Sequence, residues 1–92
     1  MESKEFQREL EALGKRINQL RKHRKLRLLD VEMLSGINDS DISRYERGLL
    51  NIEFHTIFKL AKALQVDVKS LADYDGPLPD NTNFKKAAKR KG

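Results

Sequence analysis

The sequence predicts an all-α fold of five helices with an extended first helix. Apolar side chains recur every three or four residues in several stretches, as on one face of a helix, and turn-forming residues separate these stretches. Gly76, Pro77 and Pro79 then interrupt the pattern, and a polar, basic end follows. We therefore predict one helical domain over residues 1–74, and a linker with a flexible, disordered basic tail over residues 75–92.

Composition indicates a small binding module. With 92 residues the chain is long enough for one modest core. The absence of cysteine excludes a disulfide framework and thiolate metal ligands. His23 and His55 have no other ligand at metal-binding spacing, and neither a nucleophile motif nor a Gly-rich phosphate loop occurs. We therefore expect no enzyme activity, no cofactor and no metal.

The sequence also lacks the patterns of membrane and secreted proteins. No apolar run approaches the roughly 18 residues of a membrane span. The start of the chain is acidic and polar, without the apolar centre of a signal peptide. We expect a cytoplasmic protein with no membrane partner.

One long helix is expected over residues 1–24, with Ser3 as its N-terminal cap and only Gly14 interrupting it. An apolar stripe with spacings of three and four runs along it: Phe6, Leu10, Leu13, Ile17 and Leu20. Phe6 and Leu10 either pack on the chain's own last helix or form part of a dimer contact. The first alternative is preferred, because two side chains make a small seam.

A turn and a short helix are expected over residues 35–48, S-G-I-N-D-S-D-I-S-R-Y-E-R-G. Gly36 suits a left-handed position that ends the preceding helix. Asn38 can cap the next helix, with Asp41 as a capping partner. At about 100 degrees per residue, the packing face of this helix consists of Ile42, Tyr45, Glu46 and Leu49. Its polar outer face consists of Ser40, Ser43, Arg44 and Arg47.

Further helices are expected on both sides of this segment. Residues 28–35 form a supporting helix with Leu28, Val31 and Leu34 at a spacing of three. Residues 54–64 form another helix, whose core face consists of Phe54, Ile57, Phe58, Ala61 and Leu64. Asp67 caps a short last helix over residues 68–73, with Leu71 buried.

Positive charge is concentrated in two segments of a chain whose formal net charge is +5. Residues 15–27 carry seven Lys or Arg and no acid, residues 85–91 carry five more, and residues 28–48 between them are net negative. A basic run beside a polar helix suggests a polyanion as partner, although a solvated helix face is the alternative. The basic tail either contacts DNA phosphates or only aids solubility.

Three runs of residues share one register: L-G-K-R-I-N-Q-L-R at 13–21, I-S-R-Y-E-R-G at 42–48, and T-I-F-K-L-A-K-A-L-Q-V-D at 56–67. They resemble the phage-repressor or XRE-type helix-turn-helix family over residues 13–71. Two helices joined by a short turn with glycine, the second helix carrying hydrogen-bond donors outward, are the layout of such proteins. The resemblance implies a compact five-helix repressor-like domain that binds double-stranded DNA and regulates transcription.

The resemblance also implies roles for individual residues. The positions that usually face the major groove, and so contact bases, are occupied by Asp39, Ser40, Ser43 and Arg44. The guanidinium of Arg44 can pair with the two acceptors of guanine. The candidate phosphate contacts are Lys25, Arg27, Arg47 and Asn51. The candidate dimer contacts, in a loop that family members often place beside their two-fold axis, are Leu50 and Ile52.

Glu46 falls on the packing face of the presented helix, where an ionised carboxylate is costly unless it is paired. The resemblance supplies Arg21 as its partner, so we assign both residues to a structural ion pair. Two positions depart from the family pattern. Leu28 stands where a Gln commonly contacts phosphate, and Glu32 stands where a small Ala is common. We expect Glu32 to turn out to solvent or to pair with a neighbouring cation.

Two functions remain open at this stage. The leading hypothesis is a sequence-specific regulator that acts as a homodimer by occupying a two-fold related operator. The alternative is a protein-interaction module on the same scaffold, including an antitoxin that binds a toxin, with weak or no DNA binding. The acidic balance of residues 28–48, together with Leu28 and Glu32, supports the alternative.

Overall fold

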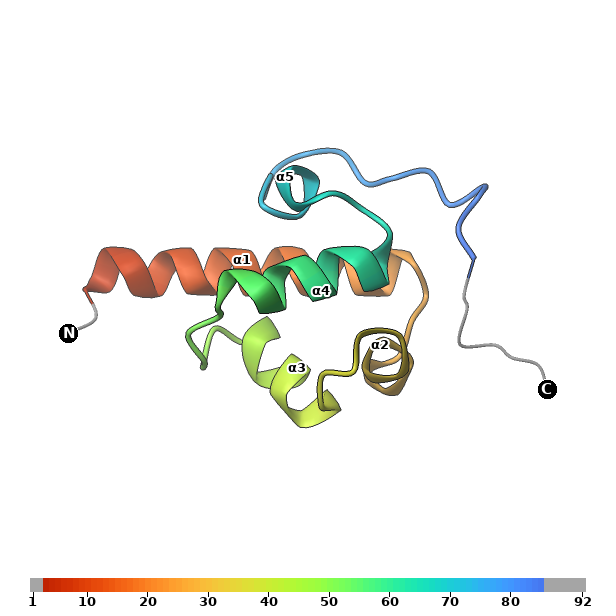
Figure 1. Cartoon of the computed structure of the whole chain (residues 1–92). Helices are drawn as coiled ribbons and strands as arrows, with labels where there is room; N and C mark the ends of the chain where they lie inside the picture. Colours follow the sequence, from red (N-terminus) through yellow and green to blue (C-terminus); the bar gives the residue numbers. More distant parts are fainter. Residues whose placement is uncertain (1–2, 86–92) are drawn as a thin grey trace.

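A computed structural model of the chain describes residues 3–85. Within these residues every regular element is a helix: α1 (Lys4–His23), α2 (Leu28–Ser35), α3 (Asp39–Glu46), α4 (Phe54–Leu64) and α5 (Val68–Leu71). The all-α, five-helix prediction is confirmed. In Figure 1, α1 and α4 run through the middle, with α2 and α3 on one side and α5 on the other.

The long helix α1 is the element on which the others are assembled. It begins at the Ser3 cap, whose hydroxyl accepts a hydrogen bond from the Phe6 amide at 3.0 Å. Its stripe of apolar side chains packs against α3, α4 and α5, while α2 packs against α3 and α4. Phe6 and Leu10, at the start of the stripe, are half-buried.

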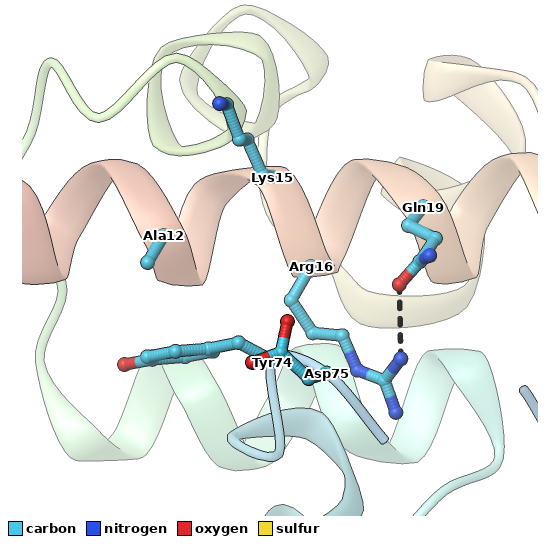
Figure 2. A pocket seen from close by; sticks show the side chains of 6 residues that line it. All are labelled: Ala12, Lys15, Arg16, Gln19, Tyr74 and Asp75. Atoms are coloured by element: carbon cyan, nitrogen blue, oxygen red, sulfur yellow. Dashed lines mark hydrogen bonds between the residues drawn. The ribbon is translucent and has the colours of Figure 1, made fainter. Parts of the chain in front are cut away.

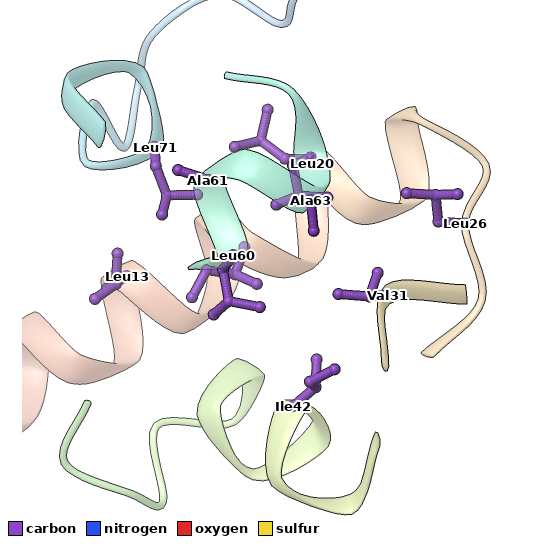
Figure 3. Packing of buried hydrophobic residues seen from close by; sticks show 11 residues of the cluster. Leu13, Leu20, Leu26, Val31, Ile42, Leu60, Ala61, Ala63 and Leu71 are labelled. Carbon is purple, nitrogen blue, oxygen red and sulfur yellow. The ribbon is translucent and has the colours of Figure 1, made fainter. Parts of the chain in front are cut away.

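The core draws apolar side chains from all five helices (Figure 3). Ile17 and Leu20 of α1 meet Ile42 of α3 and Leu64 of α4, and each of the four is at most 1% exposed. The remaining members of the buried cluster are Leu13, Leu26, Val31, Leu60, Ala61, Ala63 and Leu71. Burial of such side chains is the main free energy that stabilises a domain of this size.

The predicted core face of α4 is partly wrong. Phe54 and Phe58 are 67% and 47% exposed, whereas Leu60 and Ala63 are buried. Relative to the prediction the helix is rotated about its axis, so that a face centred on Leu60 and Leu64 packs in the core against α1, α2 and α5 and the two phenylalanines face solvent. Leu49, predicted to pack, is also exposed, by 59%.

Two glycines allow close contacts between helices: Gly36 at the corner between α2 and α3, and Gly14 between α1 and α3. Gly36 ends α2 in the left-handed region at φ 80°, as predicted. Gly14 lies where α1 crosses α3, and a Cβ added there would be only 2.6 Å from the carbonyl oxygen of Glu46. Gly14 therefore allows the two helix backbones to touch, a role that the sequence analysis missed.

Two arginines, one in α1 and one directly after it, point inward and hold the chain that follows α5. Arg16 is 2% exposed and donates to the carbonyl oxygens of Ser70, Gly76 and Pro77. Figure 2 shows its guanidinium directed away from α1, with a hydrogen bond to Gln19. Of the seven cations in residues 15–27, Lys15, Lys22, Lys25 and Arg27 remain exposed, while the arginines that point inward are used inside the fold.

Arg24 makes the second internal attachment. It is 6% exposed and donates to the Leu64 and Gln65 carbonyl oxygens at the end of α4, and to the Asp80 carbonyl oxygen. A guanidinium at a helix C-terminus satisfies carbonyls that have no partner within the helix. We name residues 76–85, which Arg16 and Arg24 hold against α1, the C-terminal strap. The predicted domain boundary follows Tyr74, and these contacts continue beyond it. The residues after Lys85, including most of the predicted basic tail, lie outside the described part.

Candidate nucleic-acid interface

The outer face of α3 is polar and open to solvent. Ser40, Arg44 and Arg47 are exposed, while Asp39 and Ser43 are half-buried. On the opposite side of the helix, Ile42 is fully buried in the core. The four predicted base-contact residues therefore belong to the part of α3 that does not pack on the core.

A buried ion pair fixes α3 to α1. Arg21 Nε lies 2.7 Å from Glu46 Oε2, and Arg21 Nη2 lies 3.0 Å from Glu46 Oε1, which is a bidentate contact. The two side chains are 11% and 6% exposed. Asn18, which the sequence analysis missed, donates to the same carboxylate at 2.8 Å. Because the carboxylate is fully engaged, α3 is held in one orientation.

Glu32 holds the other end of α3. Its Oε1 accepts from the amide of Asp39, the first residue of α3, at 2.8 Å. The expectation that Glu32 faces solvent or pairs with a cation is wrong, because its carboxylate caps a helix N-terminus, where negative charge is stabilising. Asn38 caps the same end through the Ser40 amide at 2.9 Å. The second unusual position, Leu28, is half-buried and packs against the core.

Asp41 was predicted as a capping partner, but its carboxylate binds Arg44 instead. Arg44 Nη1 and Asp41 Oδ1 lie 2.9 Å apart, one turn of helix from each other. The side chains are 48% and 45% exposed, so the pair contributes at most about 1 kcal/mol to stability. The carboxylate therefore orients the guanidinium on the open face without burying it.

The four candidate phosphate contacts are exposed and come from three places in the chain. Lys25 and Arg27 lie in the connection between α1 and α2, Arg47 lies at the end of α3, and Asn51 lies in the loop that follows. Lys25 has left-handed backbone, with φ 60°. Hydrogen bonds from Arg27 to the Asp30 carboxylate raise the pKa of the Arg27 guanidinium above its usual range. The side chain of Arg27 is nonetheless 75% exposed and retains free donors.

The predicted dimer residues differ in their surroundings. Ile52 is half-buried and packs against the chain's own core, and Leu50 is half-buried. Three neighbours in sequence that were predicted to face the core, Leu49, Phe54 and Phe58, are exposed instead.

One hollow in the described surface is lined by an arginine whose hydrogen-bond donors are all used within the chain. It lies between α1 and the chain after α5, and Figure 2 shows its lining residues Ala12, Lys15, Arg16, Gln19, Tyr74 and Asp75. The five N–H groups of the Arg16 guanidinium make five hydrogen bonds within the chain. No donor of Arg16 is left for a ligand. Among residues 3–85, no group of three or more His, Cys, Asp and Glu is placed to hold a metal ion.

Comparison with protein families agrees with this geometry. The helix-turn-helix family profile matches residues 17–71, which include the C-terminal end of α1 and all of α2, the turn, α3, α4 and α5. The chain belongs to the XRE-type helix-turn-helix family. It is accordingly a DNA-binding transcription regulator, in which α2 and α3 form the helix-turn-helix unit.

A solved structure shares the fold. The restriction-modification controller protein C.AhdI from Aeromonas hydrophila superposes with a TM-score of 0.66 and is 34% identical in sequence. The similarity covers 67% of this chain and 94% of that protein. A comparison with curated protein sequences gave no match. Within the described residues, no helix of this helix-turn-helix protein is both long and apolar enough to cross a bilayer.

Proposed function

We propose that the protein is a sequence-specific transcription regulator that binds a two-fold related operator as a homodimer. The observation that supports this most directly is the outer face of α3, which is open to solvent while the helix itself is fixed at both ends. The Arg21–Glu46 ion pair holds its C-terminal end, and Glu32 holds its N-terminal end. A rigid helix with an unobstructed polar face fits the major groove of B-form DNA.

In this proposal α3 reads base edges through its side chains. Arg44 makes two hydrogen bonds to guanine, an interaction that discriminates by about 1 to 3 kcal/mol. Ser40 and Ser43 donate to bases or to the adjoining phosphates, and Asp39 accepts from the amino group of cytosine. The amide of Asp39 is already bonded to Glu32, and that of Ser40 to Asn38. Side chains, rather than these backbone amides, therefore carry the recognition.

Phosphate contacts set the register of α3 on the duplex. Lys25 and Arg27 contact the backbone at the start of α2, and Arg47 and Asn51 contact it beyond the end of α3. All four are exposed on connections that flank the helix-turn-helix unit. These contacts give the affinity that depends on salt, and α3 gives the sequence preference.

The homodimer is formed by the apolar surface at the start of α4. The proposed contacts are Leu50 and Ile52 from the loop, joined by the exposed side chains of Leu49, Phe54 and Phe58. Phe54 and Phe58 stand one turn apart on α4 and so share a face. Because Ile52 also packs on the chain's own core, the exposed residues carry more of the contact than Ile52 does.

The protein-interaction alternative loses two of its supports. Leu28 packs against the core and Glu32 caps α3, so both departures from the family pattern stabilise the helix-turn-helix unit. The similarity to a restriction-modification controller protein makes control of such an operon the first biological role to examine.

Selection of bound duplexes from a random pool, carried out at two salt concentrations, tests the proposal. An inverted repeat with half-sites about one helical turn apart is the expected result. Enrichment of a single half-site would contradict the homodimer, and failure to enrich any sequence would contradict sequence-specific regulation. In the second case the protein-interaction module becomes the better account.

A further inference from the structure

The helix α1 ends in a turn that presents Lys25. The Leu26 amide donates to the Arg21 carbonyl oxygen at 3.1 Å. Inside this bond, the Lys25 amide donates to the Lys22 carbonyl oxygen at 2.9 Å. Lys25 has the left-handed conformation with which many helices end, and it is exposed. The position of its side chain therefore depends on how firmly the last turn of α1 is held.

The C-terminal strap completes this end of α1. The carbonyl oxygen of His23 accepts from the Asn81 side chain at 2.9 Å. The same side chain accepts from Arg24 Nη1 at 2.8 Å, so one amide group binds two consecutive residues. The guanidinium carbon of Arg24 also lies 4.4 Å from the centroid of the Phe84 ring, a cation–π contact. The strap thus holds the two residues that directly precede Lys25.

On the other side of Lys25, Arg21 links the turn to α3. Arg21 Nη1 donates to the Leu26 carbonyl oxygen at 2.9 Å, while its Nε and Nη2 bind the Glu46 carboxylate. One guanidinium therefore fixes the turn relative to the helix that we propose reads bases. Lys25 lies between this attachment and that of the strap, which suits a phosphate contact that sets the register of α3.

Arg27, the neighbouring candidate for phosphate contact, is positioned by a different element. Its amide and its Nη2 each donate to the Asp30 carboxylate at 2.8 Å. Both residues belong to the capping of α2, so the first turn of that helix holds Arg27. The two exposed cations of this corner therefore differ in their support: the strap holds the backbone before Lys25, and α2 holds Arg27.

We propose that Asn81 and Phe84 are positioning residues for DNA binding, which hold Lys25 where it contacts a duplex phosphate. The inference rests on the proposed function and deepens it, because neither residue touches DNA in this arrangement. A lysine side chain loses conformational freedom when it binds, and a fixed backbone beneath it reduces that loss. Without the strap contacts, the backbone before Lys25 is freer and the phosphate contact is made less often.

A double-mutant cycle between the strap and Lys25 tests the inference. Asn81→Ala with Phe84→Ala removes the side-chain contacts to His23 and Arg24 and keeps every charge. We expect this pair to weaken binding to a short random-sequence duplex about three- to tenfold near 0.1 M salt, and to flatten the salt slope by up to about 0.9, the value of one phosphate contact. In a Lys25→Ala background the pair should change affinity by less than about twofold, because the contact that it supports is already absent.

The matched control is the same cycle with Arg27→Ala. Because α2 holds Arg27, the strap pair should weaken binding in that background by the same factor as in the parent chain. Thr82→Ala, which removes a hydrogen bond to Asp80 inside the strap, should leave affinity unchanged. Losses of equal size in the Lys25→Ala and Arg27→Ala backgrounds would show a general loss of stability and overturn the inference.

Asn81→Ala alone provides a milder variant, in case the pair does not fold. Asn81 is exposed, so its truncation leaves the core intact, which circular dichroism and urea denaturation check. We expect about a two- to threefold loss of affinity, again absent in the Lys25→Ala background. Unchanged affinity in a folded strap variant would overturn the inference while the proposed function stood. A parent chain that binds no duplex at any salt concentration would overturn both.

Discussion

Arg44 carries the largest share of the proposed base recognition, and its surroundings explain why it can. Asp41 holds the guanidinium on the open face of α3, yet both side chains remain about half-exposed. Such a pair costs little to break or to share with a base. The carboxylate therefore restricts the rotamers of Arg44 before DNA arrives, which lowers the entropy lost on binding.

Two substitutions should separate base readout from phosphate contact. Arg44→Ala should relax the preference for one base position by about 1 to 3 kcal/mol, because the bidentate contact to guanine is lost. Lys25→Ala should weaken binding to all duplexes alike and flatten the salt slope by about 0.9. Binding to a set of single-base operator variants at several salt concentrations measures both effects. Equal loss on every duplex for Arg44→Ala would remove it from base recognition.

The Arg21–Glu46 pair should be essential to stability as well as to the position of α3. Glu46→Gln leaves the Arg21 guanidinium, only 11% exposed, without its counter-charge. We expect the free energy of unfolding to fall by about 3 to 5 kcal/mol, as for other buried pairs that lose one partner. Urea denaturation measures it. Asp41→Asn, which breaks an exposed pair, is the control and should cost less than about 1 kcal/mol.

For a single residue, the sequence predicts the contact when only one kind of partner can satisfy the charge or hydrogen-bonding groups of the side chain. An inward carboxylate at Glu46 required a cation, and the family pattern named Arg21. Glu32 had a third option, a backbone amide seven residues away, which depends on the angle of the α2–α3 corner. The internal use of Arg16 and Arg24 was missed for a similar reason, since their partners are carbonyl oxygens far along the chain.

Among the elements, the crossing of α1 and α3 depends most on a single residue. A Cβ on Gly14 would meet the backbone of Glu46, which cannot move as a flexible side chain can. Gly14→Ala should therefore force the helices apart, cost about 1 to 3 kcal/mol of stability and weaken DNA binding by tilting α3. Lys15→Ala, exposed on the same helix, is the control for thermal unfolding and duplex affinity. Normal stability in Gly14→Ala would show that the two helices can separate freely.

The short helix α5 should make stability depend on acid pH. Hydrogen bonds from the Ser70 hydroxyl and amide lower the pKa of Asp67. Those from Thr82 act in the same way on Asp80 in the strap. A carboxylate with a lowered folded pKa stabilises the fold above its unfolded pKa, and this contribution is lost as pH falls through the folded pKa. We expect thermal stability to decline below about pH 4. In Asp67→Asn, which can still cap α5, the decline should be smaller, and an identical pH profile would contradict this assignment.

Element boundaries were predictable because caps and glycines mark them, whereas the rotation of α4 was not. Its sequence carries apolar side chains around more than half of the helix, so several faces satisfied the spacing rule. Packing against α1, α2 and α5 buries the face with Leu60 and Leu64, and leaves Phe54 and Phe58 outside. Phe54 and Phe58, which were wrongly predicted to face the core, are the residues now proposed to contact a second copy of the chain.

For the whole molecule, the proposed dimer predicts that substitutions in two pairs of exposed apolar residues will have different effects on oligomeric state. Phe54→Ser with Phe58→Ser should shift sedimentation equilibrium toward monomer and weaken operator binding, because the contact at the start of α4 is lost. Leu29→Ser with Met33→Ser on α2 is the matched control, since these side chains are exposed by 46% and 59%. A shift caused by the α2 pair and not by the α4 pair would place the dimer surface elsewhere.

The fold as a whole followed from the helical periodicity and the family resemblance, because each helix has its own local signals. The path of the chain after α5 could not be predicted from the helical periodicity or from the family resemblance. Gly76, Pro77 and Pro79 have the composition of a linker, yet side chains more than fifty residues earlier hold this segment. Arg16 donates to the carbonyl oxygens of Gly76 and Pro77, and a ring nitrogen of His23 lies against that of Pro79. Such attachments depend on a three-dimensional position that composition does not encode.

The backbone of Lys25 has a consequence for attempts to engineer this domain. Glycine would adopt its left-handed conformation freely, whereas lysine pays roughly 1 kcal/mol for it. A search for heat-resistant variants would therefore favour glycine at this corner and, in doing so, remove a positive charge that we propose contacts the DNA backbone. At position 25, a substitution that raises thermal stability is therefore expected to weaken operator binding.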